Sequence, residues 1–303
     1  MLSDDVERYV RLRQTLGFKF HDAAKQLRTF TAFATANGDT HVRTSTAVAW
    51  AAQAPSPNAR YIRLRNVHQV ARFLHVEDPV HEVPPANLFH SPKVRSLPYI
   101  YSREELREIV KAAGRLRRTY RLRRQVYATL LGLIAATGLR ISEALDLRVS
   151  DVLPDGILRI RHTKFGKTRL VPLHPTALAA LRVYLDVRLR SAATDDHVFL
   201  SPHNRRIASS TVNATFRRVL RLARITPTQR GWPRIHDVRH TFATRALEQC
   251  STKREAVARH FVALATYLGH ADIANTYWYL EATPELLRDI SAAAEALVAE
   301  EMP

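Results

Sequence analysis

Apolar residues recur at helical spacing through the first 76 residues of the chain. Three of the four runs stop at residues that end helices, namely Gly17, Asn37-Gly38 and Pro55-Ser56-Pro57. The fourth run extends from Asn58 to Val76, and arginines alternate with its apolar positions. The pattern predicts a four-helix domain with a basic outer surface at residues 1–78.

The composition changes at residues 79–98, where five prolines occur and the apolar periodicity stops. Proline blocks helices and stiffens an extended chain, so this stretch is predicted to be a linker. Lys93 and Arg95 lie in it and are candidates for phosphate contacts, although charged linker residues are more often only solvated.

Residues 99–303 combine helices with a small sheet. Ser102 and Glu105 have the spacing of a capping box at a helix start. Residues 157–161, in which apolar and basic positions alternate, and residues 168–173 are typical of two strands with one buried face. Further helices are predicted at residues 130–136, 176–189, 211–224, 237–249, 254–268 and 285–300. The predicted fold is mainly α, with a small antiparallel β-sheet in the second domain.

The net charge of +18 and the isoelectric point near 10.7 indicate a polyanionic partner, either nucleic acid or an anionic membrane. The sequence has no run of eighteen apolar residues, and its first residues lack the layout of a signal peptide. We therefore expect a cytoplasmic protein that binds nucleic acid. Cys250 is the only cysteine, which excludes a disulfide within the chain and a cysteine-rich zinc site.

Three segments carry groups suited to phosphodiester chemistry without a metal. They are Thr137-Gly138-Leu139-Arg140-Ile141-Ser142-Glu143, His236-Asp237-Val238-Arg239-His240, and Leu268-Gly269-His270 with Tyr279 nine residues later. Arginine presents paired donors to phosphate oxygens, and a helix N-terminus such as that near Arg239 favours an anion. Taken alone, Arg140 and Glu143 are more typical of a surface ion pair on a helix.

His236 and His240 are also spaced to share a helix face, which would suit a metal ion. That interpretation requires a third ligand and usually an HExxH glutamate, and neither is evident in the sequence. We therefore expect no metal and no other cofactor. His236 is interpreted as a hydrogen-bond donor or proton carrier, and His240 as its structural neighbour.

In their order and spacing these segments resemble the tyrosine recombinase (phage integrase) family. The resemblance is close over the C-terminal two-thirds of the chain and loose over the rest. It implies that Tyr279 attacks a phosphodiester, forms a 3′-phosphotyrosyl link and releases a 5′-hydroxyl, with neither metal nor ATP. The resemblance assigns the supporting roles to Arg140, Lys164, His236, Arg239 and His270, with Glu143 beside Arg140.

Two of these assignments have competitors nearby. Tyr277 is a second candidate nucleophile, but the interval from His270 favours Tyr279. Lys167 shares a turn with Lys164, the residue that the resemblance assigns as the acid for the leaving oxygen. The interval from Arg239 to His270 is longer than is usual in the family, and we expect its extra residues to extend a loop or helix away from the centre.

The resemblance also implies partners: double-stranded DNA with paired recognition sites, and a homotetramer on synapsed DNA formed from a free monomer or weak oligomer. The acidic, amphipathic helix at 285–300 is expected to dock into a neighbouring protomer, or else to fold back on its own domain. In a bacterial cell the protein would be associated with the nucleoid. Candidate DNA contacts are Arg60, Arg63, Arg65, Lys93, Arg217 and Arg221.

Two alternative functions remain open from the sequence. A type IB topoisomerase would use the same chemistry without paired sites, but the four-helix N-terminal domain favours a recombinase. A catalytically silent DNA-binding protein would have no need of the full set of reactive residue types. The segment Thr276–Leu280 is more typical of mobile-element integrases than of housekeeping ones.

Overall fold

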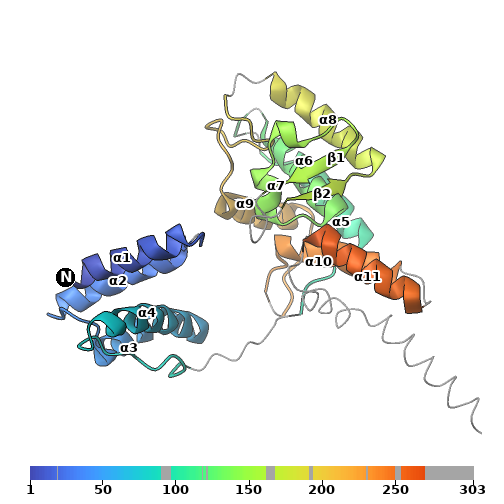
Figure 1. Ribbon diagram of the computed structural model, residues 1–303. Helices are drawn as coiled ribbons and strands as arrows, with labels where there is room; N and C mark the ends of the chain where they lie inside the picture. Colours follow the sequence, from blue (N-terminus) through green and yellow to red (C-terminus); the bar gives the residue numbers. More distant parts are fainter. Residues whose placement is uncertain are drawn as a thin grey trace, which may run out of the picture. The chain divides into compact units, whose positions relative to one another are not determined.

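The computed structural model describes residues 1–18, 20–89, 97–117, 119–120, 122–161, 168–190, 194–229, 231–249 and 254–269, the first five of the last range as backbone only (Figure 1). The chain divides into two compact units, Met1–Arg95 and Ser96–Pro303. Each unit has its own hydrophobic core. In the described part of the chain, no helix has both the length and the apolar character needed to cross a membrane.

The first unit is a bundle of helices, as the sequence predicts. Its helices are α1 (Leu2–Thr15), α2 (His21–Ala36), α3 (Thr44–Ala52) and α4 (Pro57–Glu77). The Ser56 hydroxyl accepts the Ala59 N–H at the start of α4, and Pro57 occupies the first turn, where its missing N–H costs nothing. Arg8, Arg28 and Arg43 are paired with glutamates, so part of the predicted basic surface is neutralised.

The proline-rich segment that follows α4 packs on the first unit as far as residue 89. Val83 and Phe89 lie against its core, and His81 is only 4% exposed. A ring nitrogen of His68 is 2.8 Å from the carbonyl oxygen of Pro84. Residues 90–96, which include Lys93, lie outside the described residues.

The second unit is built around α6, which packs against α5, α8 and α10. Its described helices are α5 (Arg103–Gly114), α6 (Arg123–Thr137), α7 (Ile141–Asp146), α8 (Pro175–Leu189), α9 (Ser209–Leu222), α10 (Ile235–Glu248) and α11 (Arg254–Leu268), with a 3-10 turn at Val149–Asp151. The predicted capping box is present, since Ser102 N–H donates to Glu105 (2.7 Å) and Glu105 N–H donates to the Ser102 hydroxyl (3.0 Å).

The predicted pair of strands is confirmed as β1 (Ile157–Ile160) and β2 (Arg169–Pro172), which are antiparallel. Leu158 and Ile160 are buried, as the alternation of apolar and basic residues predicts. In the register Ile160 lies opposite Arg169. The turn at residues 162–167 lies outside the described residues.

Candidate active site

The end of α6 is shaped by a glycine that no other residue can replace without strain. Gly138 has φ +62°, and an ideal Cβ there would lie 2.5 Å from the Phe242 ring and 3.2 Å from the Leu268 side chain. The left-handed residue ends the helix and reverses the chain. Arg140 follows after Leu139 and is the residue that precedes α7.

Glu143 holds Arg140 in place from the first turn of α7. Its carboxylate accepts the Arg140 backbone N–H (3.0 Å) and the Arg140 Nη1–H (2.7 Å). The same carboxylate accepts two hydrogen bonds from Arg169, at 2.9 and 2.8 Å. Burial alone would raise the pKa of Glu143, but hydrogen bonds and positive charge from Arg169, joined by the hydrogen bonds from Arg140, lower this pKa to about 2. Glu143 is therefore a carboxylate at neutral pH.

The start of α10 is fixed by a buried acid. The carboxylate of Asp237 accepts the Arg234 backbone N–H (2.7 Å) and the Arg234 Nη2–H (2.9 Å). This cap places His236 and Arg239 in the first turns of the helix. The Arg239 side chain is 2% exposed and donates to the Gly138 carbonyl (2.7 Å) and to the Leu268 carbonyl (2.8 Å).

Three arginines converge on the C-terminus of α11. Arg140 donates to the Leu268 and Gly269 carbonyls at 3.4 and 3.2 Å, Arg239 shares the Leu268 carbonyl, and Arg169 donates to the Tyr267 carbonyl at 2.9 Å. The last carbonyls of a helix lack partners within the helix and carry partial negative charge, so arginines stabilise them. These arginines therefore gather immediately before position 270.

The long interval between Arg239 and position 270 is occupied largely by the rest of α10 and by α11. Phe261, Leu264 and Leu268 of α11 pack against Ala243 and Leu247 of α10. Much of this interval is therefore helical, and the end of α11 lies beside the arginines.

The two histidines of α10 face each other. The rings of His236 and His240 lie 4.7 Å apart between centroids and meet edge to face. The pKa of His236 is lowered by burial and then by the charge of Arg239, although the residue as a whole is exposed. Burial and the neighbouring His236 lower the pKa of His240 to about 4. Both rings are therefore neutral at pH 7, a state in which each carries one N–H donor.

The structure thus brings together four of the candidate residues: Arg140, Glu143, His236 and Arg239. Lys164, His270 and Tyr279 lie outside the described residues. The sequence analysis missed Arg169. Arg169 lies on the same face of β2 as the buried Val171. A charged side chain on a buried strand face needs an acidic partner, and this pattern in the sequence could have indicated Arg169.

The candidate DNA contacts differ in their surroundings. Arg63 is half-buried, donates to the Trp50 carbonyl (3.3 Å) and lies over the Trp50 ring. Arg60 is exposed and donates to the Ala54 carbonyl at 3.1 Å, and Arg65 is exposed beside Tyr61. Within the first unit, then, Arg63 is the most constrained of the three by neighbouring groups.

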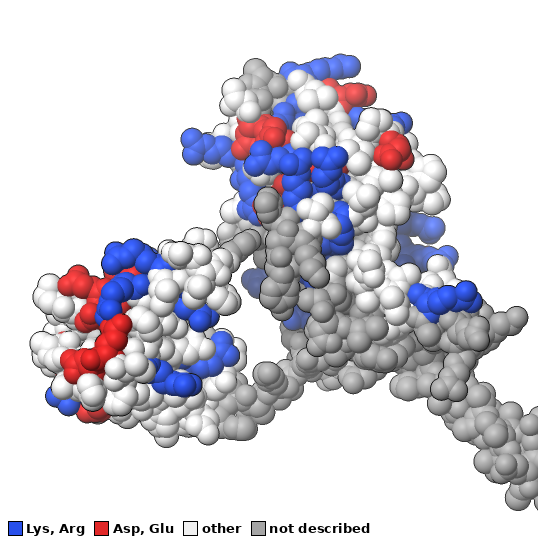
Figure 2. Space-filling model, in the orientation of Figure 1, with Lys and Arg blue, Asp and Glu red and all other residues white. Residues whose placement is uncertain are grey.

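On the second unit, Arg217 and Arg221 line an open depression on α9 of about 450 Å³, together with Arg218. Figure 2 shows many basic and few acidic side chains on the visible face of this unit. On the first unit basic and acidic side chains lie next to one another (Figure 2). Because three arginines line it, the depression on α9 is a suitable surface for a polyanion.

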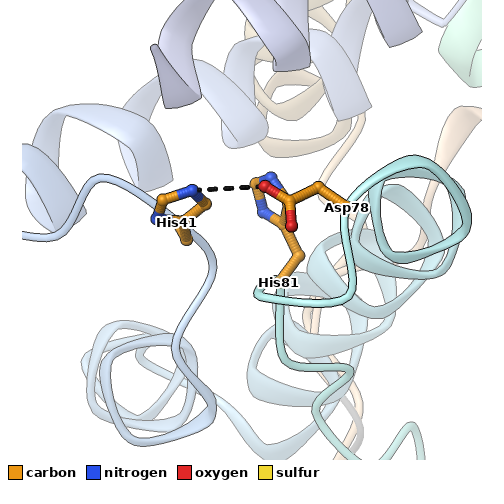
Figure 3. Close-up of side chains that lie close together, drawn as sticks. All are labelled: His41, Asp78 and His81. Atoms are coloured by element: carbon orange, nitrogen blue, oxygen red, sulfur yellow. Dashed lines mark ion pairs between the residues drawn. The ribbon is translucent and has the colours of Figure 1, made fainter.

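A separate cluster of His41, Asp78 and His81 in the first unit has the residue types of a metal site (Figure 3). Its hydrogen bonds do not fit one. The Val42 N–H donates to Nδ1 of His81, and burial and the neighbouring His41 lower the pKa of His81, so the neutral ring carries its proton on Nε2. Neither nitrogen of His81 then offers a free lone pair to a cation. The cluster instead ties the segment after α4 to the loop between α2 and α3.

Comparison with known proteins identifies the family of the chain. The sequence model of the phage integrase family matches residues 101–285. The chain belongs to the phage integrase family. It is 37% identical over 295 residues to a putative integrase/recombinase, y4rB, of Sinorhizobium fredii, with 94% of each chain covered. It is 30% identical over 240 residues to tyrosine recombinase XerD of Oceanobacillus iheyensis, covering 75% of this chain and 71% of XerD.

Among solved structures, lambda integrase in a tetramer bound to a Holliday junction has the same fold. The TM-score is 0.63 at 17% identity, over 92% of this chain and 76% of that one. Family membership confirms the predicted fold class, with its helical units and small antiparallel sheet. It also confirms the predicted enzyme class, a tyrosine-type site-specific DNA recombinase.

Proposed function

We propose that this integrase-family enzyme cleaves and rejoins double-stranded DNA at paired sites through Tyr279, with neither metal nor ATP. The observation that supports this most strongly is the shared acceptor of Arg140 and Arg239. Both guanidinium groups donate to the Leu268 carbonyl, although Arg140 precedes α7 and Arg239 lies in α10. Two fixed positive charges directly before position 270 are the arrangement that a pentavalent phosphorane, with its extra negative charge, requires.

In the proposed reaction, the Tyr279 oxygen attacks the phosphorus and loses its proton. The bond from phosphorus to the 5′-oxygen breaks, and Lys164 gives that oxygen a proton. The products are a 3′-phosphotyrosyl link and a free 5′-hydroxyl, and attack by a 5′-hydroxyl from the partner duplex reverses the step. His236 and His270 donate hydrogen bonds to the phosphate oxygens while the arginines neutralise the charge.

Without DNA, the carbonyls at the end of α11 occupy the donors of Arg140 and Arg239. An ionised phosphate oxygen is a stronger acceptor for arginine than a neutral carbonyl. We therefore expect phosphate to replace some of these contacts when the site is filled. The carbonyls hold the two side chains near their working positions beforehand, which lowers the entropic cost of binding.

For the assembly, we propose a homotetramer on two synapsed duplexes, by analogy with the lambda integrase tetramer. Residues 1–78 would form a core-binding domain, 79–98 a linker and 99–303 the catalytic domain. The helix predicted at 285–300 would dock into the neighbouring protomer. The enzyme would act in the bacterial cytoplasm, on the nucleoid.

The test is covalent capture on DNA without divalent ions. The enzyme is incubated in excess EDTA with sheared genomic DNA of its host, and detergent-stable adducts are isolated and sequenced. We expect adducts enriched at a sequence with inverted half-sites. Adducts that form only when Mg²⁺ is restored would contradict the metal-free mechanism, and relaxation of plasmids that lack the enriched sequence would indicate a topoisomerase instead.

A further inference from the structure

Arg169, the first residue of β2, is a buried arginine at the edge of the active site. Its side chain is 11% exposed, and that of its partner Glu143 is 7% exposed. The pair is bidentate, with Nη1 donating to Oε1 at 2.9 Å and Nη2 donating to Oε2 at 2.8 Å. Two parallel hydrogen bonds fix the orientation of the carboxylate as well as its position.

The same guanidinium also holds the end of α11. Its Nε–H donates to the Tyr267 carbonyl at 2.9 Å. Gly269 has φ +69°, and an ideal Cβ at this position would lie 2.7 Å from Arg169 Nη1. A glycine is therefore needed both for the left-handed backbone and for the space that the guanidinium occupies. Arg169 and the end of α11 thus fit each other closely.

We propose that Arg169 is a positioning residue for DNA cleavage. It sets the place of Glu143, and through Glu143 that of Arg140, relative to the end of α11. The inference rests on the proposed function, because it concerns the cleavage step. Arg169 acts through its neighbours, since its three donor nitrogens are all engaged by Glu143 and Tyr267.

The positioning depends on charge as well as shape. Glu143 accepts hydrogen bonds from Arg140 only through lone pairs, and protonation would turn one of its oxygens into a competing donor. Arg169 contributes most to lowering the pKa of Glu143. Without Arg169, this pKa would rise, because burial would be opposed less strongly. Arg169 therefore keeps Glu143 ionised under conditions in which a carboxyl as buried as this one would begin to take up a proton.

The test compares Arg169→Met and Arg169→Lys with Arg188→Met as a matched control. Arg188 lies on α8, is 2% exposed and donates to the carbonyls of Asp195 and His197, so its loss also removes buried arginine hydrogen bonds. Single-turnover formation of the covalent adduct is measured on a nicked suicide duplex that carries the captured site. The rate is followed between pH 4.5 and 9, and DNA affinity is measured by fluorescence anisotropy.

We expect Arg169→Met to lower the cleavage rate about 10- to 100-fold while DNA affinity changes less than about 3-fold. In the wild type, protonation of Glu143 lies below the measured range, because its pKa is about 2. In Arg169→Met this protonation should move up into the measured range and shift the acid limb of the pH–rate profile to higher pH. Arg169→Lys keeps the charge but loses the paired geometry. It should be slower than the wild type, with an acid limb that does not move. Arg188→Met should lose thermal stability and keep both the rate and the profile.

An Arg169→Met protein with the wild-type rate and profile would overturn the inference. So would equal losses in Arg169→Met and Arg188→Met with no movement of either acid limb, since that result would show a general structural role. If Arg169→Met does not fold, Arg169→Lys decides, and a wild-type rate in that variant would refute positioning. A wild-type enzyme that forms no adduct on any DNA would refute the proposed function itself, and this inference with it.

Discussion

Replacing Glu143 with glutamine should destabilise the second unit and slow cleavage together. The carboxylate of Glu143 accepts hydrogen bonds from Arg140 and Arg169 and is only 7% exposed. Glutamine has nearly the same shape, but its amide nitrogen would face arginine donors and no negative charge would remain between two guanidinium groups.

Two estimates give the loss of folding free energy in Glu143→Gln. The pKa of Glu143 falls from its ordinary value of 4.5 to about 2, as burial is overcome by Arg169 and Arg140. At about 1.4 kcal/mol per pKa unit, this corresponds to roughly 3 kcal/mol of folding free energy. Removing one partner of a buried ion pair typically costs about 3–5 kcal/mol, which agrees. For a unit of this size we expect the Tm to fall by about 6–12 °C.

The assay is differential scanning calorimetry of the full chain, with Asp151→Asn as the control. Asp151 is also a buried acid that accepts a backbone N–H, from Arg148 at 3.2 Å, and it is paired with Arg161 at 2.5 Å. It contacts none of the candidate catalytic residues described above. We expect a comparable loss of stability in Asp151→Asn with a retained cleavage rate, and a loss of both in Glu143→Gln.

The pH dependence sharpens this prediction. The folded-state pKa of Glu143 is depressed, so its contribution to stability is complete above pH 4.5 and is lost as the pH falls towards 2. The difference in Tm between wild type and Glu143→Gln should shrink over that range. The reasoning would be refuted if the two proteins differed by less than about 1 kcal/mol in their free energy of unfolding at pH 7. It would also be refuted if this difference stayed constant as the pH fell to 2.5.

Three further predictions follow from the described residues. Gly138→Ala should cost about 2–5 kcal/mol, because it combines left-handed strain with a clash against Phe242; an equal loss in a Phe242→Leu background, measured by chemical denaturation, would contradict the clash. DNA affinity should fall on the order of 10³-fold between about 50 and 200 mM salt, since a chain of charge +18 releases counterions from DNA; an almost flat dependence in anisotropy titrations would show that the charge serves another purpose. Equimolar Zn²⁺ should leave the Tm of the first unit unchanged, because Val42 N–H occupies Nδ1 of His81; a rise in Tm that disappears in His41→Ala would overturn this.

The helices and their ends were largely predictable from the sequence. Helical periodicity located each helix described in the first unit, and Gly138 and the Ser102–Glu105 capping box marked boundaries that the structure confirms. These signals are local, because they depend on backbone conformations and hydrogen bonds within a few residues. The strands were predictable for the same reason, from the alternation in residues 157–161.

The convergence of three arginines on α11 was not predictable in this way. Arg140, Arg169 and Arg239 donate to main-chain carbonyls, which every residue possesses, so no side-chain pattern marks the acceptors. The packing of Val83 and Phe89 on the first unit also depends on tertiary contacts. Proline-rich composition excludes a helix in that segment, but it does not tell whether the extended chain lies against a core or leaves it.

The identity of the nucleophile tests the central claim most directly. Wild type, Tyr279→Phe and Tyr277→Phe are each incubated with the same nicked suicide duplex in EDTA, and the covalent adduct is measured after denaturation. We expect the adduct with wild type and with Tyr277→Phe, and none with Tyr279→Phe, which should bind the duplex with nearly unchanged affinity because it lacks only one hydroxyl. An adduct that persists in Tyr279→Phe, or one that is lost only in Tyr277→Phe, would contradict the account.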